Sequence, residues 1–503
     1  MILAEVLATV REVTTDATTV AGVADTMEVS AIAYDSRRVV ACAVFVALRG
    51  LKADGVAFAA QAGARGAALI VAETARPEGA TTPWLVVSDA RLALALLADA
   101  FYDHPSRRMR VVGVTGTNGK TTTSYLLASM FDAAGMKTGL LGTVTYRLGD
   151  EEREASRTTP EAPDVQQLLD EMIRQRCAAA VMEVSSHALA LKRVDGMRFA
   201  AGVFTNLTRD HLDFHEDMET YFLAKRRLFE MLPADAPGVI NLDDPRGVTL
   251  LDIVSKPMTF AISRSADVSP GPLELTLRGL SFEIRTPAGA VHVESHLVGR
   301  PNVSNILAAT ATAVALGLPL DAISEGVRTL PGVPGRFEVV SSGDDDVTVV
   351  VDYAHTDDAL RNLLETARSL ASERLITVFG CGGDRDRTKR PLMGMVASRL
   401  SDLVIVTSDN PRSEDPNRII DEIKRGIPAG AQAGRAQEVQ SIVDRREAIE
   451  RAIEQAEPGD LVLIAGKGHE KYQQIGDRVL PFDDAQVARA ALGRRRDRPA
   501  RAT

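Results

Sequence analysis

The residues best suited to chemistry lie in the stretch Val111–Thr123, where a β-branched apolar run leads into a glycine-rich loop and then a helical pattern. Gly116 and Gly119 allow backbone N–H groups to close around phosphate oxygens, and the start of the helix adds its positive end. Lys120 supplies a mobile cation, and the hydroxyl of Thr121 is suited to Mg²⁺. The alternative is a glycine-rich turn with a chance Lys-Thr pair, which the strand before it and the helix after it disfavour. The stretch therefore predicts a site for a nucleotide triphosphate.

Acidic and histidine side chains follow the next two predicted strands. Glu183 interrupts the apolar run of residues 178–184 near its carboxyl end. A carboxylate at that position of a parallel sheet faces the ligand crevice, within reach of a metal on the phosphates. The following strand, residues 200–205, leads to His211 and His215. A metal or phosphate role is favoured for His211, whereas His215 could simply cap a helix or face solvent.

Two later elements bear on the same site. Residues 221–229 have a short amphipathic helical pattern, in which Lys225 would ordinarily be a surface lysine. Further along, Gly299–Asn305 precedes an Ala-rich helical pattern that runs to about Ala315, and Asn302 or Asn305 could cap this helix or contact a base. The Gly- and Pro-rich stretch Gly332–Gly335 is then expected to end the nucleotide domain.

The last third of the chain repeats strand-then-helix units, and each predicted strand ends in a polar loop. These strands are residues 347–352, 375–380, 403–407 and 461–465. Ordinary turns would explain one such loop, but four loops at one edge of a parallel sheet predict a second binding surface.

Two arginines indicate what this second surface binds. Arg390 and Arg412 follow the second and third of these strands, and their planar forks are suited to carboxylates. A phosphate loop together with a carboxylate-binding surface indicates phosphoryl activation of a carboxylate.

The pattern along the chain predicts an α/β protein of three domains. These are residues 1–107, 108–334 and 335–492, followed by a disordered tail at 493–503. The central domain is expected to hold a P-loop-type mononucleotide-binding sheet, and the C-terminal domain a Rossmann-like doubly wound sheet. In the N-terminal domain, two short strands end in polar turns that suit either ligand contacts or simple helix caps.

Composition excludes several classes of protein. With 45% hydrophobic and 25% charged residues, the 503-residue chain has the make-up of an ordinary soluble protein. Aromatic residues at 4% and a net charge of -10 argue against nucleic-acid binding. The three widely spaced cysteines give neither a disulfide framework nor a metal pattern, which fits a reducing cytoplasm. No apolar run is long enough to insert into a membrane.

Five motifs carry a resemblance to a known family. They are Gly116-Thr-Asn-Gly-Lys-Thr-Thr122, Glu183-Val-Ser-Ser-His187, Thr205-Asn-Leu-Thr-Arg-Asp-His-Leu-Asp213, Val351-Asp-Tyr-Ala-His355 and Gly466-Lys-Gly-His-Glu470. Together they resemble the Mur ligase family of peptidoglycan precursor synthesis, in the same order over nearly the whole chain. The resemblance implies a monomeric, cytoplasmic, ADP-forming amide ligase that uses ATP and Mg²⁺.

The resemblance also implies roles for individual residues. Lys120 and Thr121 would hold the phosphates, and Lys120, Glu183, His211 and Lys225 would act in catalysis. The implied Mg²⁺ ligands are Thr121, Glu183, His211 and Lys225, the last at the position where the family carries a carbamylated lysine. The residues that match the ATP site are Gly116, Thr117, Asn118, Gly119, Lys120, Thr121, Thr122, Asn302, Arg336 and Asp352.

Two further sets match the other substrates of the family. The residues that match the contacts of UDP-N-acetylmuramoyl-L-alanyl-D-glutamate are Tyr34, Ser36, Leu51, Lys52, Ala53, Thr158, Thr159, Ser185 and Arg193. Those that match the incoming amino acid are Arg390, Asp409, Asn410, Pro411, Arg412, Gly466 and Glu470.

The motif Asp409-Asn-Pro-Arg412 predicts which amino acid is joined. Diaminopimelate differs from lysine by a second carboxylate, and an arginine fork is the group that selects for it. The sequence therefore favours diaminopimelate. Two alternatives stay open: a sister ligase that adds a dipeptide or extends folate with glutamate, and a catalytically silent nucleotide-binding paralogue.

Overall fold

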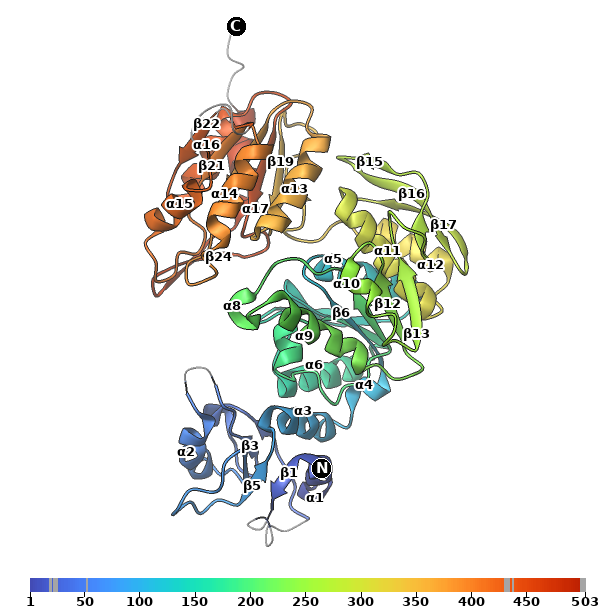
Figure 1. Ribbon diagram of the computed structural model, residues 1–503, viewed down its shortest axis with the longest axis vertical. Coiled ribbons are helices and arrows are strands. Elements are labelled where there is room, and N and C mark those ends of the chain that lie inside the picture. Colours follow the sequence, from blue (N-terminus) through green and yellow to red (C-terminus); the bar gives the residue numbers. More distant parts are fainter. Residues whose placement is uncertain (18–19, 21–25, 51–52, 429–434, 437, 498–503) are drawn as a thin grey trace.

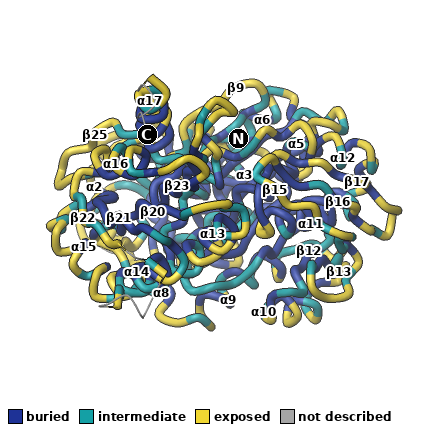
Figure 2. The backbone as a smooth tube through the Cα atoms, turned by 90° about the horizontal axis from the view of Figure 1, so that it is seen from above, coloured by how far each residue is buried: buried dark blue, intermediate teal, exposed yellow. Residues whose placement is uncertain are grey.

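The computed structural model describes residues 1–17, 20, 26–50, 53–428, 435–436 and 438–497. It shows three domains that follow one another along the longest axis of the molecule, coloured from blue through green to red in Figure 1. The strands are largely buried, and the exposed residues gather on loops and on the outer sides of helices (Figure 2). Within the described ranges, no helix is long and apolar enough to cross a membrane.

The N-terminal domain is built on a sheet of order β1-β5-β4-β3-β2, in which only β1 runs antiparallel to its neighbour. Both predicted strands of this domain are present, as β2 and β3. Its elements are α1 (Leu3–Ala8), η1 (Arg11–Val13), β1 (Thr14–Asp16), β2 (Ile32–Ala33), η2 (Ser36–Arg38), β3 (Val44–Val46), η3 (Gly55–Phe58), α2 (Ala59–Ala64), β4 (Leu69–Ala72), β5 (Trp84–Val87) and α3 (Ala90–Phe101). A single turn, α4 (Pro105–Arg108), leads into the central domain.

The central domain is organised around β6 (Arg110–Thr115), which lies between β11 and β10 in a sheet of order β13-β12-β11-β6-β10-β7-β8-β9. The strands from β13 to β7 are parallel. The remaining elements of this sheet layer are α5 (Lys120–Ala133), β7 (Thr138–Leu141), β8 (Thr145–Leu148), β9 (Glu151–Glu154), α6 (Ala162–Arg174), β10 (Ala179–Glu183), α7 (Ser186–Ala190), β11 (Ala201–Phe204), α8 (Leu212–His215), α9 (Met218–Glu230), β12 (Pro237–Asn241), α10 (Pro245–Val248), β13 (Lys256–Phe260), α11 (Arg300–Ala315) and α12 (Leu320–Thr329).

Alternation along β6 explains why helices cover both faces of this sheet. Val112 and Val114 share one core with α5, α11 and α12, whereas Val111 shares the other with α6 and α9. A strand that is apolar on both sides can only be buried in this way. The loop that follows β6 therefore leaves the middle of the sheet, at the edge where ligands of open parallel sheets bind.

One part of the central domain was not predicted. Between β13 and α11 the chain forms a small antiparallel sheet, with the long hairpin β16 (Gly279–Thr286) and β17 (Gly289–Ser295) flanked by β14 (Ser269–Pro270) and β15 (Glu274–Thr276). The buried residues alternate along the hairpin, with Leu280, Phe282 and Ile284 on one strand. This period of two is the sequence signal that would have revealed it.

The C-terminal domain contains the four predicted strands, and all four are parallel in a sheet of order β18-β19-β23-β20-β21-β22. Helices α13 to α15 cover one face, and α16 and α17 the other. Its elements are β18 (Glu338–Val339), β19 (Thr348–Asp352), α13 (Asp357–Leu370), β20 (Leu375–Phe379), α14 (Lys389–Leu400), β21 (Leu403–Val406), α15 (Pro416–Lys424), β22 (Glu438–Ser441), α16 (Arg445–Gln455), β23 (Leu461–Ala465), β24 (Tyr472–Ile475), β25 (Arg478–Pro481) and α17 (Asp484–Arg496).

The predicted disordered tail begins too early. Residues 493–496 belong to α17, because the arginines at its end are held by carboxylates of the same domain rather than by water. The ion pairs are Arg494 with Glu450, Arg495 with Asp346 and Arg496 with Asp345, at 2.8, 2.7 and 3.2 Å. Residues 498–503 lie outside the described part of the chain.

Candidate active site

A cavity of about 270 Å³ lies between the central and C-terminal domains, at the carboxyl end of β6. Apart from Gly116, every residue predicted for the nucleotide site lines it: Thr117, Asn118, Gly119, Lys120, Thr121, Thr122, Asn302, Arg336 and Asp352. Two of these, Arg336 and Asp352, come from the start of the C-terminal domain. The cavity is therefore closed by both domains together.

The phosphate loop has little freedom to adopt another shape. Gly116 and Gly119 have left-handed backbone angles, with φ of 147° and 85°. A Cβ atom on Gly116 would lie 1.9 Å from Thr205 Oγ1, and one on Gly119 would lie 2.3 Å from Asn305 Oδ1. Only glycine fits at these two positions. The loop leads directly into α5, so that backbone N–H groups at the start of this helix face the cavity where phosphates would lie.

Two lysines converge on the carbonyl oxygen of Gly116. Lys120 Nζ donates to it at 2.9 Å and also to Thr117 O, while Lys225 Nζ donates from the opposite side at 2.7 Å. Lys225 is only 1% exposed, and its ammonium lies 4.4 Å from the centre of the Tyr221 ring. Burial, reinforced by nearby Lys120, holds the pKa of Lys225 well below its usual range. Burial also lowers the pKa of Lys120.

Oxygen and nitrogen donors for a metal gather near the same loop. Thr121, Glu183 and His211 line the cavity, whereas Lys225 lies beneath the loop. The Glu183 carboxylate accepts from the backbone N and the hydroxyl of Thr143, at 2.8 and 3.1 Å. Burial lowers the pKa of His211 to about 4, which keeps its imidazole neutral and able to act as a ligand. Across the described residues, no group of three His, Cys, Asp or Glu could hold a metal alone.

One alternative drawn from the sequence, that His215 faces solvent, is wrong. Its side chain is 2% exposed, and its Nε2 lies 2.9 Å from the hydroxyl of Ser186. The ring also packs beside Tyr221 and His187, so that it fixes the loop after β11 against α7.

Asn302, Arg336 and Asp352 form another part of the cavity wall. The Asp352 carboxylate accepts from the backbone N–H groups of Phe337 and Ala354, at 2.7 Å each. Arg336 donates to the Thr121 hydroxyl at 3.2 Å. Asn302 donates to a backbone carbonyl in the preceding turn and accepts from the Asn305 amide. Asn302 and Asn305 thus form hydrogen bonds at the start of α11 and also line the cavity.

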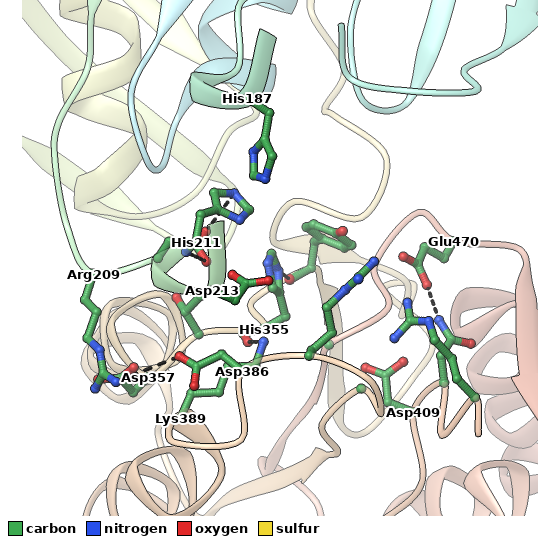
Figure 3. Close-up of a pocket in the computed structure, with 18 of the residues that line it drawn as sticks. His187, Arg209, His211, Asp213, His355, Asp357, Asp386, Lys389, Asp409 and Glu470 are labelled. Carbon is green, nitrogen blue, oxygen red and sulfur yellow. Dashed lines mark hydrogen bonds and ion pairs between the residues drawn. The ribbon is translucent and has the colours of Figure 1, made fainter. Parts of the chain in front are cut away.

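A second cavity, of about 360 Å³, opens beside the first at the loops of the C-terminal domain. Its wall includes five of the residues predicted for the amino acid: Asp409, Asn410, Arg412, Gly466 and Glu470. The two cavities share the wall residues Asp210, His211, Tyr353, His355 and Thr356. In Figure 3, His187 and His211 of the central domain face Asp386, Lys389 and Asp409 of the C-terminal domain across this space. The glycine-rich loop and the predicted carboxylate-binding surface therefore meet at one place.

Arg412 is held at the cavity wall by its backbone. Its residue has a left-handed φ of 51°, and it pairs with the turn of the β24–β25 hairpin. Its N–H donates to Gln474 O at 3.1 Å, and its carbonyl oxygen accepts from Gly476 N at 2.7 Å. The guanidinium uses one donor, on Gly383 O at 2.6 Å, of the five that an arginine has.

Arg390 does not line the second cavity, contrary to the prediction. Its side chain is fully buried, and the guanidinium is already taken by protein acceptors. It donates to Glu414 at 2.8 and 3.0 Å, to Glu422 at 2.7 Å and to Gly382 O at 3.1 Å. The guanidinium of Arg390 therefore fixes the loop after β20 and does not bind a ligand. Pro411 does not line this cavity either; its carbonyl oxygen packs against Gly383.

Replacing Arg390 with methionine should destabilise the C-terminal domain by about 3 kcal/mol, because it leaves two carboxylates without their buried partner. The Arg390 guanidinium lowers the pKa of Glu414 from 4.5 to about 2. This stabilisation of the folded state is fully present above the pKa that Glu414 has in the unfolded chain. It is lost as the pH falls toward the pKa of Glu414 in the folded chain. In urea unfolding, the free energy of unfolding should therefore fall less in the variant than in the wild type when the pH is lowered from neutral to about 3.5.

The matched control for this measurement is Arg399→Met, which removes an exposed arginine from the same helix, α14. It should leave both the stability and its pH dependence unchanged. Equal stability of Arg390→Met and the wild type at neutral pH would contradict the structural role.

Comparison with known proteins agrees with this arrangement. The sequence matches the family models for the Mur ligase family catalytic domain over residues 28–102, the Mur ligase middle domain over residues 114–313 and the Mur ligase glutamate ligase domain over residues 335–468. The UDP-N-acetylmuramoyl-L-alanyl-D-glutamate–2,6-diaminopimelate ligase of Gloeobacter violaceus is 49% identical over 473 residues, which cover 94% of this chain and 95% of the relative. The chain belongs to the Mur ligase family. The resemblance drawn from the five motifs is thereby confirmed.

Solved structures of Mur ligases have the same architecture. A structure of UDP-N-acetylmuramoyl-L-alanyl-D-glutamate–2,6-diaminopimelate ligase superimposes with a TM-score of 0.66 at 36% identity, covering 93% of this chain and 96% of that one. The MurF ligase of Thermotoga maritima, solved in complex with ADP, shares the fold with a TM-score of 0.63 at 19% identity, covering 92% and 98% of the two chains. The three-domain α/β fold expected from the sequence is confirmed.

In this Mur ligase, the described residues among those predicted for the UDP end lie apart from the two cavities. The Tyr34 hydroxyl donates to Asp164 at 2.5 Å and lines a separate cavity of about 370 Å³ between the N-terminal and central domains. Ser36 is buried and donates to Gln61 at 2.7 Å, and Ala53 is exposed. Leu51 and Lys52 lie outside the described residues.

The residues predicted for the muramoyl-peptide part connect these regions. Thr158 and Ser185 line the nucleotide cavity. Thr159 and Arg193 do not; Thr159 donates to Glu183 O at 2.8 Å, and Arg193 donates to Thr159 O at 3.0 Å and pairs with Glu161 at 2.7 Å. Thr159 and Arg193 therefore support the strand end that carries Glu183.

Several cavity residues of the Mur ligase were missed or given no role by sequence reasoning. Asp210 and His355 belong to the quoted motifs, and this was the available signal. Tyr353 lies in one of the quoted motifs too, whereas Lys389 carries no such signal. Both residues line the second cavity, and Lys389 donates to His355 O at 2.7 Å. The Asn118 amide also donates to Asp358 across the domain boundary, at 3.3 Å.

Proposed function

We propose that this Mur ligase joins diaminopimelate to UDP-N-acetylmuramoyl-L-alanyl-D-glutamate, with conversion of ATP to ADP and phosphate. The observation that carries the proposal is the shared wall of the two cavities. A phosphate-binding loop lies on one side of that wall, and the motif Asp409–Arg412 lies on the other. The relative that is 49% identical carries this activity in its name.

The proposed reaction has two steps. The glutamyl carboxylate of the precursor attacks the γ-phosphorus of ATP, the bond to the bridging oxygen breaks, and ADP leaves with that oxygen. This yields an acyl phosphate, while Lys120 and the N-terminus of α5 offset the negative charge that spreads over the transferred group. The neutral amine of diaminopimelate then attacks the acyl carbon, an amide bond forms, and phosphate leaves with the former carboxylate oxygen.

Mg²⁺ would be held at the phosphate end of the nucleotide cavity. Thr121 and Glu183 fit this ion, since a hydroxyl and a carboxylate are the hard oxygen ligands it prefers and the substrate phosphates complete its shell. When bound, Mg²⁺ supplies positive charge to the phosphate oxygens. His211 contributes a neutral nitrogen at the edge of the same site.

Lys225 fits the metal site only in a modified form. As an ammonium it would repel the ion, but its lowered pKa provides the neutral amine that reacts with CO₂. The resulting carbamate is an anion with oxygen donors. We propose that Lys225 acts in this form, as the resemblance to the family implies.

The nucleotide-sugar end of the precursor would lie against the N-terminal domain. Tyr34 lines the cavity between this domain and the central one, whereas Thr158 and Ser185 line the cavity at the phosphate loop, and the precursor would run from the first to the second. We propose that the precursor extends along this path, so that only its glutamyl end reaches the shared wall.

Incubation with ATP, the precursor and either diaminopimelate or lysine tests the proposed function. Phosphate should be released only when all three substrates are present, and mass spectrometry should find the diaminopimelate adduct in large excess over the lysine adduct. Release of phosphate without an amino acid adduct, or equal joining of both amino acids, would contradict the proposal.

A further inference from the structure

Lys467 is fully buried directly behind the amino acid cavity, and the proposed reaction gives it no role. It follows β23, and its ammonium points back toward three residues of the cavity wall. Nζ lies 3.1 Å from Asn410 Oδ1, 3.2 Å from Glu470 Oε2 and 3.7 Å from Asp409 Oδ1. Lys467 itself is not part of the wall. Any effect on a bound amino acid must therefore pass through these three side chains.

The contacts fix which way the Asn410 amide points. Its Oδ1 accepts from Lys467 Nζ and from the backbone N–H of Gln474, the latter at 2.9 Å. Its Nδ2 then donates to Glu470 Oε2 at 2.8 Å. A flipped amide would place two N–H groups against the ammonium, which has no acceptor. Asn410 and Glu470 thus have one arrangement at the wall of the cavity.

Lys467 also balances the charge at this wall. Asp409 and Glu470 are two poorly hydrated carboxylates, and burial raises the pKa of Glu470 while the ammonium of Lys467 opposes that rise. Among the described residues, the other charged or titratable groups that interact with these carboxylates are Arg445, Tyr353, Tyr472 and Cys381. Arg445 is already paired with Asp484 at 2.7 Å. Lys467 is therefore the cation in direct contact with Glu470 among the described residues.

We propose that Lys467 is a positioning residue for the amino acid substrate: it holds Asn410 and Glu470 in the orientation and charge state that a substrate ammonium group requires. The inference rests on the proposed function, since it takes the second cavity as the diaminopimelate site. An ionised Glu470 attracts one of the two ammonium groups of diaminopimelate, whereas a protonated one does not.

The test compares steady-state kinetics of the wild type with Lys467→Met and Lys467→Arg. In Lys467→Met the KM for diaminopimelate should rise by about 10- to 100-fold, the range expected for loss of a hydrogen bond to a charged group. The KM values for ATP and for the precursor should change by less than about twofold, since those substrates bind elsewhere. Lys467→Arg keeps the charge and should recover part of the loss. Lys471→Met, which removes an exposed lysine of the same loop, is the matched control.

The pH dependence separates positioning from a general loss of structure. Without the ammonium, the pKa of Glu470 rises further, so more of the carboxyl is protonated near neutral pH. The ratio of the two diaminopimelate KM values, Lys467→Met over wild type, should therefore fall as the pH increases from about 6.5 to about 9. Taking the ratio cancels the titration of the substrate itself.

Two outcomes would overturn the proposal: an unchanged KM for diaminopimelate in Lys467→Met, or a ratio that does not vary with pH. If Lys467→Met does not fold, a KM in Lys467→Arg that matches a neutral Lys467→Gln variant would overturn it as well. Failure of the proposed function is a separate result, because then the wild type itself would join no diaminopimelate.

Discussion

Replacing Lys225 with methionine should lower the turnover of ligation by about 100- to 1,000-fold or more, the loss seen when one charge-stabilising group is removed from a transition state. Methionine matches the length of the lysine but cannot bind Gly116 O or form a carbamate. Because the Lys225 amine is buried, replacing it with methionine should not reduce the free energy of unfolding. Phosphate release at saturating substrates measures the effect.

A neighbouring substitution provides the control for Lys225. Arg226→Met removes a side chain that is 40% exposed and pairs with Glu230 on the outer side of the same helix, so turnover should stay within about twofold. The carbamate is tested in Lys225→Ala, where formate should restore part of the activity by placing a carboxylate in the vacated space. Turnover in Lys225→Met above about a tenth of wild type would contradict a catalytic role for this lysine.

Replacing Arg412 with alanine should reduce the preference for diaminopimelate over lysine by about 100-fold or more, because a site built to bind a polar group strongly rejects the analogue that lacks it. Among the described residues, only one of its five donors is bound to protein, and the N–H and carbonyl groups of Arg412 are fixed by the β24–β25 hairpin. The change should come mainly from a higher KM for diaminopimelate. Competition between the two amino acids, with the products weighed, gives the ratio directly.

The exposed Arg418 on α15 gives a matched control for Arg412. Arg418→Ala should leave the preference unchanged. A preference that survives Arg412→Ala would show that another group recognises the second carboxylate. The neighbouring Arg385 and Lys389, which also line the cavity, would then be the first residues to replace.

That the residues proposed for the nucleotide site lie together was predictable because their signals are local. The strand, the glycine loop and the helix start are consecutive in the sequence, and the two glycines are required by close contacts and backbone angles that no other residue tolerates. That the polar loops after the four parallel strands of the C-terminal domain lie together was predictable for a similar reason. Parallel strands bring their carboxyl ends to one edge, so the loops after them must lie close together.

Contacts between distant residues explain what the sequence did not reveal. Arg390 was expected to face a ligand, but Glu414 and Glu422 lie 24 and 32 residues further along the chain, and the packing of α14 against α15 and the loop before it brings them to its guanidinium. The helical pattern alone would make Lys225 an ordinary surface lysine, and its expected metal role came from the resemblance to the family. Its spacing of four from Tyr221 places it on the buried side of α9, a helical signal that was available.

Transfer of oxygen from the precursor to phosphate tests most directly the central claim, that ATP activates a carboxylate at the wall shared with the amino acid cavity. The precursor is labelled with ¹⁸O in its glutamyl carboxylate and incubated with ATP and diaminopimelate. If ATP activates this carboxylate, each phosphate released should carry one labelled oxygen. That oxygen bridges carbon and phosphorus in the acyl phosphate and leaves with the phosphate when the amine attacks. Phosphate free of label, with the amide product still formed, would contradict it.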